Sequence, residues 1–118
     1  MHELSIAASI VETVLQEIAR KSLPPVQTIA VRIGALSSVD PGALRFGFDS
    51  LISDTPLAQT KLEIEFVPAG GKCRACGQDF AVQDFVFACP RCDSGQIDMT
   101  RGDELDIAYL EVEDGRET

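Results

Sequence analysis

The chain has 118 residues and a formal net charge of −9, from 19 acidic and 10 basic side chains. This length predicts one domain, or one domain with a small appendage. The acidic balance argues against binding to nucleic-acid phosphates and to anionic membranes. No stretch reaches the roughly 20 apolar residues of a transmembrane helix, and no signal peptide is recognisable. We therefore expect a soluble, cytoplasmic protein with reduced thiols.

The first predicted element is a helix over residues 4–20. Apolar residues recur at helical spacing and should form its buried stripe, which Ile10 and Val14 widen. The stripe comprises Leu4, Ala8, Val11, Leu15 and Ile18. The proline pair at 24–25 cannot continue a helix, so we expect the helix to end by about Ser22.

A strand and a second helix follow. Residues 26–33 are rich in β-branched side chains, which alternate with Arg32 on the outer face and predict a half-buried strand. Asp40 and Pro41 form a typical helix start, with an N-cap side chain followed by proline at the first helical position. This second helix should bury Leu44 and Phe48 and end before Pro56.

Two further strands are predicted at residues 61–67 and 104–112. In the first, Leu62, Ile64 and Phe66 alternate with charged residues and should face inward. The last four residues, 115–118, should fray.

The four cysteines form two C-x-x-C pairs, Cys73 with Cys76 and Cys89 with Cys92, separated by 12 residues. This spacing is typical of a closed four-thiolate metal site, for which zinc is the default ion. Iron in a rubredoxin-like site is the alternative for the same ligands. Two disulfides or two redox motifs are the other interpretations, and a reducing compartment disfavours disulfides.

Residues 70–101 should form the module that carries these cysteines. Phe80, Phe85 and Phe87 lie between the pairs and should make a small apolar floor. About 30 residues cannot bury enough surface to fold alone, so the metal must stabilise the module. We therefore predict an α+β fold: a three-stranded sheet with two helices on one face, formed by residues 1–69 and 102–118. The zinc-ribbon-like module is inserted before the last strand.

The chain end is a second candidate metal site. His2 is the single histidine and stands next to the N-terminus. Its imidazole, its backbone nitrogen and the Met1 amine could chelate square-planar Ni(II) or Cu(II). Glu3 and Asp40 are candidates for the remaining position. The other interpretation is a solvated chain end, with Glu3 as an acid at a helix start and Asp40 as an N-cap.

The sequence resembles the HypA/HybF family of hydrogenase maturation factors. The segments that carry this resemblance span nearly the whole chain: Met1–Ser5, Val31–Pro41, the following Leu44, Phe46 and Phe48, both C-x-x-C pairs, Gly102–Ile107 and Leu110–Val112. Some members carry histidines near the zinc cysteines, and this chain has none there, so nickel–zinc communication through such a residue is not expected.

The resemblance implies a nickel metallochaperone that is not an enzyme. It makes His2 the principal nickel ligand, with the Met1 amine and Glu3 as helpers and Asp40 as a further ligand. It assigns structural zinc to Cys73, Cys76, Cys89 and Cys92. It also implies two partners, the GTPase HypB and the large subunit of [NiFe]-hydrogenase, and leaves the oligomeric state open.

Two other classes of protein remain open from the residues alone. A zinc-ribbon adaptor would bind proteins and need no second metal. A rubredoxin-like electron carrier would hold iron, which visible absorbance would reveal.

Overall fold

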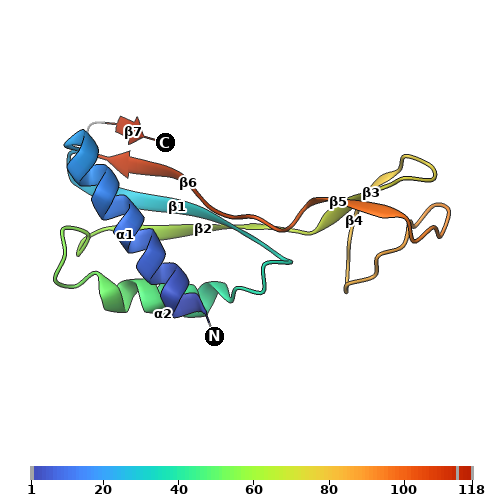
Figure 1. The fold of residues 1–118 in the computed structure, drawn as a ribbon, viewed down its shortest axis with the longest axis horizontal. Helices are drawn as coiled ribbons and strands as arrows, with labels where there is room; N and C mark the ends of the chain where they lie inside the picture. Colours follow the sequence, from blue (N-terminus) through green and yellow to red (C-terminus); the bar gives the residue numbers. More distant parts are fainter. Residues whose placement is uncertain (1, 114, 118) are drawn as a thin grey trace. The chain divides into compact units, whose positions relative to one another are not determined.

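The structure, a computed structural model, describes residues 2–113 and 115–117 (Figure 1). Its elements are α1 (Glu3–Lys21), β1 (Val26–Gly34), α2 (Pro41–Leu51), β2 (Lys61–Val67), β3 (Gly70–Cys73), β4 (Asp79–Ala81), β5 (Ile97–Arg101), β6 (Leu105–Val112) and β7 (Gly115–Glu117). The predicted α+β fold is confirmed.

The elements divide into two compact units. Unit 1 comprises Met1–Arg32, Val39–Glu65 and Asp106–Thr118, and unit 2 comprises Ile33–Ser38 and Phe66–Leu105. No helix among the described residues is long and apolar enough to span a membrane.

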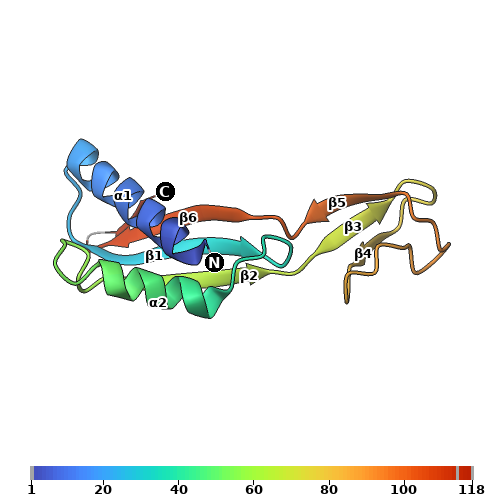
Figure 2. The same cartoon turned by 60° about the horizontal axis from the view of Figure 1, so that its bottom comes forward.

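The larger sheet has the strand order β2-β1-β6-β7. In Figures 1 and 2, β1 and β2 run in one direction, β6 runs in the other, and both helices lie on one side of the sheet. Its first three strands are the three predicted ones. The prediction that residues 115–118 fray is wrong for Gly115–Glu117, which pairs antiparallel with β6 as a short edge strand; Thr118 lies outside the described residues. The sequence Gly-Arg-Glu of this strand has no alternation of apolar and polar residues, so it could not be predicted as a strand from the sequence.

The core of unit 1 lies between the helices and the sheet. Ile29 and Val31 of β1, Leu44 and Phe48 of α2, and Leu62 of β2 are buried, as predicted. Phe66 was predicted to face inward and is 54% exposed. Alternation predicts which side chains share a face, but not how far along the strand the core extends.

The buried face of α1 agrees in part with the predicted one, because Ile10, Val11 and Val14 were predicted to be buried. Glu3, Ala7, Ile10, Val11 and Val14 are buried. Leu4, predicted in the stripe, is 56% exposed, and Ala8 is exposed as well. The helix has adjacent apolar stripes, and tertiary packing buries Ala7 instead of Leu4 and Ala8.

Unit 2 contains a small sheet of order β4-β3-β5, with both pairings antiparallel. The residues after β1 bond to both segments that flank this sheet. Ala35 donates its backbone N–H to Val67 at 2.9 Å, and Leu36 donates to Gly102 at 2.6 Å. A Cβ on Gly34 would lie 2.0 Å from the Gly102 carbonyl oxygen, so only glycine permits this approach.

Candidate metal centre

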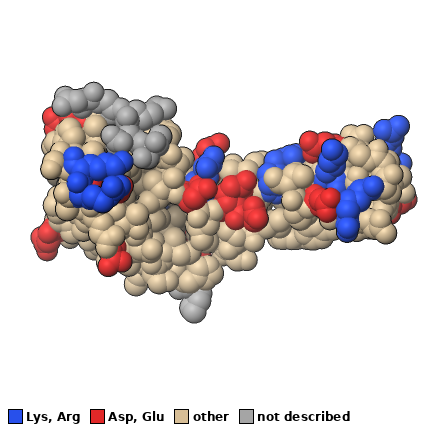
Figure 3. Space-filling view, turned by 45° about the horizontal axis from the view of Figure 1, so that its top comes forward, with Lys and Arg blue, Asp and Glu red and all other residues tan. Residues whose placement is uncertain are grey.

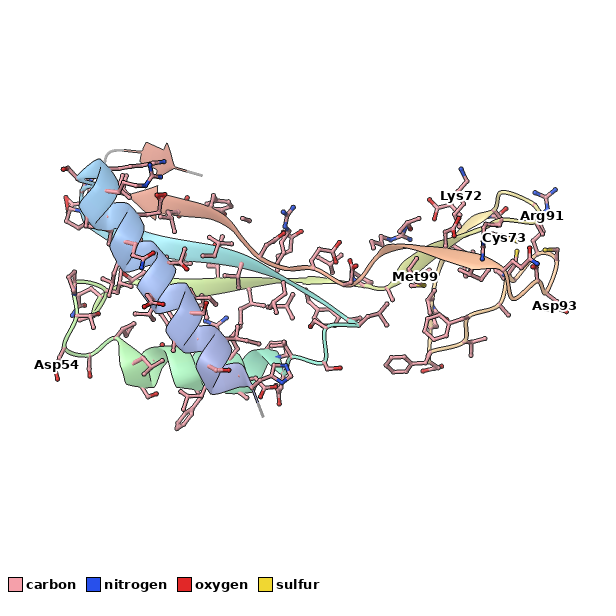
Figure 4. All side chains as sticks on the ribbon, in the orientation of Figure 1. Asp54, Lys72, Cys73, Arg91, Asp93 and Met99 are labelled. Atoms are coloured by element: carbon pink, nitrogen blue, oxygen red, sulfur yellow. The ribbon has the colours of Figure 1, made fainter. Side chains whose placement is uncertain are left out.

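The four cysteines lie on two turns of unit 2. Cys73 ends β3, and Cys76 follows three residues later in the first turn. Cys89 and Cys92 occupy the second turn, between β4 and β5. Figure 4 shows Cys73 at the end of the small sheet that also carries Lys72 and Met99, and Arg91 and Asp93 on the second turn.

The two turns share one hydrogen-bond pattern. In the first, the Cys73 backbone N–H donates to Gln78 at 2.9 Å, and its carbonyl accepts from Gly77 at 2.8 Å. In the second, the Cys89 N–H donates to Ser94 at 2.9 Å, and its carbonyl accepts from Asp93 at 2.8 Å. Gly77 and Asp93 both have left-handed backbones, with φ of 80° and 62°. The local fold therefore presents two equivalent pairs of sulfurs.

The four sulfur atoms converge. All lie within 4.8 Å of one another, and the Cys73–Cys92 and Cys76–Cys89 Sγ···Sγ separations are both 3.6 Å. A disulfide requires about 2.05 Å, so the disulfide interpretation is wrong for this structure. Zn–S bonds of about 2.3 Å in a tetrahedron place sulfurs about 3.8 Å apart. The site therefore fits a four-thiolate metal ion, and among the described residues it is the one cluster of three or more potential side-chain ligands.

Cys73 and Cys92, which lie in contact, have pKa values shifted in opposite directions. Burial opposes ionisation of Cys73, but backbone N–H groups of Cys76 and Ala75 lower its pKa to about 6. For Cys92, the backbone N–H of Ser94 favours ionisation, but the Cys73 sulfur and burial raise the pKa to about 12. The pKa is therefore lowered for Cys73 and raised for Cys92, and a divalent cation bound by the sulfurs would favour ionisation of both.

Backbone dipoles, not side-chain cations, contact the sulfurs. The Arg91 backbone N–H lies 3.3 Å from the Cys89 sulfur. Arg74 pairs instead with Asp98 at 3.3 Å, and Arg101 pairs with Asp79 at 3.3 Å. Figure 3 shows acidic and basic side chains lying side by side on this face of unit 2. The charge of a tetrathiolate complex would therefore be stabilised mainly by N–H groups of the two turns.

The expected apolar floor of the module is not formed as predicted. Phe80 is half-buried, but Phe85 is 71% exposed and Phe87 is 42% exposed. These two rings contact each other, with centroids 6.4 Å apart. The module has little aromatic core, which increases its dependence on the metal.

His2 begins α1 as its N-cap residue. Its side chain makes no capping hydrogen bond and is exposed. Its carbonyl accepts from the Ile6 N–H and the Ser5 hydroxyl, both at 2.9 Å. Met1, the other predicted donor at this end, lies outside the described residues. The structure thus holds the His2 backbone through its carbonyl while leaving the imidazole exposed.

Glu3 and Asp40 come together, although sequence reasoning did not predict a contact between them. Glu3 is 7% exposed, and its carboxylate accepts from the Asp40 backbone N–H at 3.0 Å. The Asp40 side chain caps α2, accepting from Gly42 at 2.9 Å and Ala43 at 3.5 Å. Both carboxylates are therefore engaged at helix starts, and no sequence signal links positions 37 residues apart.

Together these features define a small α+β protein with a four-cysteine metal site. The starts of its two helices are joined by the Glu3–Asp40 hydrogen bond. The family model "Hydrogenase/urease nickel incorporation, metallochaperone, hypA" matches residues 1–112. The chain belongs to the HypA family.

Curated relatives agree with that assignment, and two solved structures share the fold. "Hydrogenase maturation factor HypA" of Acidithiobacillus ferrooxidans is 40% identical over 113 residues, covering 96% of this chain and 100% of the relative. That of Desulfitobacterium hafniense is 35% identical over 114 residues, covering 97% and 100%. The solution structure of "the Ni metallochaperone HypA from Helicobacter pylori" has a TM-score of 0.64 at 21% identity, covering 95% of this chain and 97% of that one. A second HypA solution structure has a TM-score of 0.70 at 21% identity, covering 95% and 96%. The two structures show the same fold.

Proposed function

We propose that this protein is a non-enzymatic nickel carrier that binds Ni(II) at its N-terminus and delivers it for maturation of [NiFe]-hydrogenase. The observation that carries the proposal is the match of residues 1–112 to a nickel-incorporation family. The names of the curated relatives favour hydrogenase as the recipient. The partners would be the GTPase HypB and the hydrogenase large subunit, in the cytoplasm, where thiols stay reduced.

The nickel donors would be nitrogens of the chain end. The His2 imidazole, the His2 backbone nitrogen and the Met1 amine can chelate one ion, and a deprotonated amide suits square-planar Ni(II). The exposed His2 side chain supports this role. Glu3 would contribute its backbone nitrogen, since its carboxylate already bonds to the Asp40 N–H. Asp40 is a further candidate through its carboxylate.

Zinc would be the resident ion at Cys73, Cys76, Cys89 and Cys92. A closed thiolate site holds its ion, whereas a chain end can release one, so the two sites suit different tasks. In this arrangement, residues 1–69 with 102–118 form the nickel-binding domain, and residues 70–101 form the zinc-binding module. A zinc-ribbon adaptor without a second metal is the alternative.

Calorimetric nickel titration of three proteins tests the proposal: the native chain, a chain extended before Met1, and His2→Ala. Native protein should bind one Ni(II), more weakly at lower pH because the nitrogen donors must lose protons. His2→Ala should lose this binding, since the chain has no other histidine. The extension should weaken it with every side chain intact.

Zinc content and far-ultraviolet circular dichroism are the controls and should not change in either variant. One-to-one nickel binding by His2→Ala would reject the nickel site and favour the adaptor. Loss in His2→Ala with normal binding by the extended chain would keep the imidazole and exclude the terminal amine.

A further inference from the structure

The two helices of unit 1 meet closely near the start of α1 and then separate. A Cβ on Gly47 would lie 3.4 Å from a Leu4 side-chain carbon and 3.5 Å from the Ala7 Cβ, so the first turns of α1 lie against α2. From there the helices diverge (Figures 1 and 2). The space between them is an open groove of about 420 Å³, which we call the interhelical groove.

The interhelical groove is lined mainly by apolar side chains. Its apolar lining consists of Ala8, Val11, Leu15 and Ala19 from α1 and Leu51 from α2. Glu12 is its one charged lining residue. Leu4, which lies against Gly47, is 56% exposed, and Phe46, the residue before Gly47 in α2, is 76% exposed. The groove lining includes Ala8, Val11 and Leu15 of the stripe that the sequence predicted to be buried, and of these Ala8 is exposed.

The one charge on the groove lining is negative. Glu12 is exposed, and no ion pair to it is found among the residues that the structure describes. The basic side chains of the helices are engaged elsewhere. Arg20 and Lys21 pair with Glu17, and Arg45 donates to the Leu62 carbonyl. The groove therefore combines an apolar floor with one glutamate for which the described residues show no ion-pair partner.

We propose that the interhelical groove binds a basic amphipathic helix of a partner protein. An apolar groove accepts the apolar face of a helix, and Glu12 on the lining of a chain with a net charge of −9 favours lysine or arginine on its flanks. From Ala8 to Ala19 the groove follows α1 for about 16 Å, which matches about three turns of a partner helix. A second copy carries the same charge of −9, and an anionic membrane is also repelled, so charge disfavours both as occupants.

A synthetic helical peptide of about 14 residues, with leucine along one face and lysine along the other, is the probe. Fluorescence anisotropy measures its binding to the full-length protein at physiological salt. The matched variants are Ala8→Lys, inside the groove, and Ser9→Lys, outside it, at exposed positions with the same change of charge. Ala8→Lys should weaken binding by about tenfold or more, and Ser9→Lys by less than about twofold.

The controls separate this proposal from its rivals. A peptide with glutamate in place of lysine should bind more weakly. Absence of binding by the lysine peptide, equal loss in the two variants or equal binding of the glutamate peptide would overturn the proposal. So would a dimer, seen by sedimentation, that Ala8→Lys alone dissociates. His2→Ala should keep its affinity for the peptide while losing nickel binding, so the groove proposal and the nickel-site proposal can be rejected independently of each other.

Discussion

The buried carboxylate of Glu3 accepts a hydrogen bond from the backbone N–H of Asp40 at 3.0 Å. This bond joins the first residue of α1 to the N-cap of α2. It places two of the candidate nickel-site residues side by side. It also gives Glu3 a structural role that a helix-start acid in solvent would not have.

Replacement of Glu3 tests that role. Glu3→Ala would leave the partly buried Asp40 N–H without this acceptor, and we expect the free energy of unfolding to fall by about 1–3 kcal/mol. Glu3→Gln keeps a carbonyl oxygen and should cost less. Urea denaturation measures both. Glu12→Ala, at an exposed glutamate of the same helix, should change stability by less than about 0.5 kcal/mol; an equal effect of Glu3→Ala and Glu12→Ala would contradict the structural role.

Asp40 can be tested as a cap and as a ligand separately. Asp40→Asn keeps the side-chain oxygen that accepts from Gly42 and Ala43, so stability should be nearly unchanged, whereas Asp40→Ala should lose about 1 kcal/mol. Nickel titration of the Asn variant then isolates the anionic donor. A weaker nickel affinity would assign Asp40 as a ligand, and an unchanged affinity would restrict it to capping.

Removal of one thiolate should unfold the zinc-binding module without unfolding the helices. Cys76→Ala should lose stoichiometric zinc and make residues 70–101 sensitive to protease, because the module has little apolar core. Metal analysis and limited proteolysis with mass spectrometry measure this. Ala75→Ser, at an exposed non-ligand position in the same turn, is the control. Full zinc content in Cys76→Ala would reject the four-cysteine ligand set.

The two left-handed residues of the cysteine turns, Gly77 and Asp93, should differ in how well they tolerate substitution. Gly77 has φ of 80°, so Gly77→Ala should destabilise the zinc-loaded protein by about 1–2 kcal/mol. Asp93→Gly should be close to neutral, since glycine adopts the φ of 62° freely. Thermal unfolding measures both. Gly95→Ala, which meets no atom within 4 Å, is the control, and equal effects of the two alanine variants would refute the proposed strain at Gly77.

Replacement of Gly34 by alanine should destabilise the protein, because the backbone of Gly102 leaves no room for a side chain there. An alanine Cβ there would lie 2.0 Å from the Gly102 carbonyl oxygen, and backbone displacement should cost at least about 1–3 kcal/mol. Gly42→Ala, whose Cβ would meet nothing closer than 3.4 Å, serves as the comparison. Urea denaturation of the two variants should show a clear loss for Gly34→Ala alone. Comparable stability would contradict the close backbone contact.

Local sequence determined much of this protein. The β-branched run of β1, the Asp40–Pro41 start of α2 and the spacing of the four cysteines each predicted the observed structure, because each depends on interactions between residues close in the chain. The two C-x-x-C pairs predict metal ligands, since a turn of this length places both of its sulfurs on the same side of the chain, where they can bind one ion.

Tertiary structure decided the rest. Leu4 and Ala8 satisfy helical periodicity as well as Ala7 does, and only the packing of α1 on its neighbours selects which of these residues is buried. The Glu3–Asp40 bond spans 37 positions, and Asp93 takes the place that glycine holds in the first cysteine turn. In each case the partner is distant in sequence or the residue type is ambiguous, so the fold supplies the information that local patterns lack.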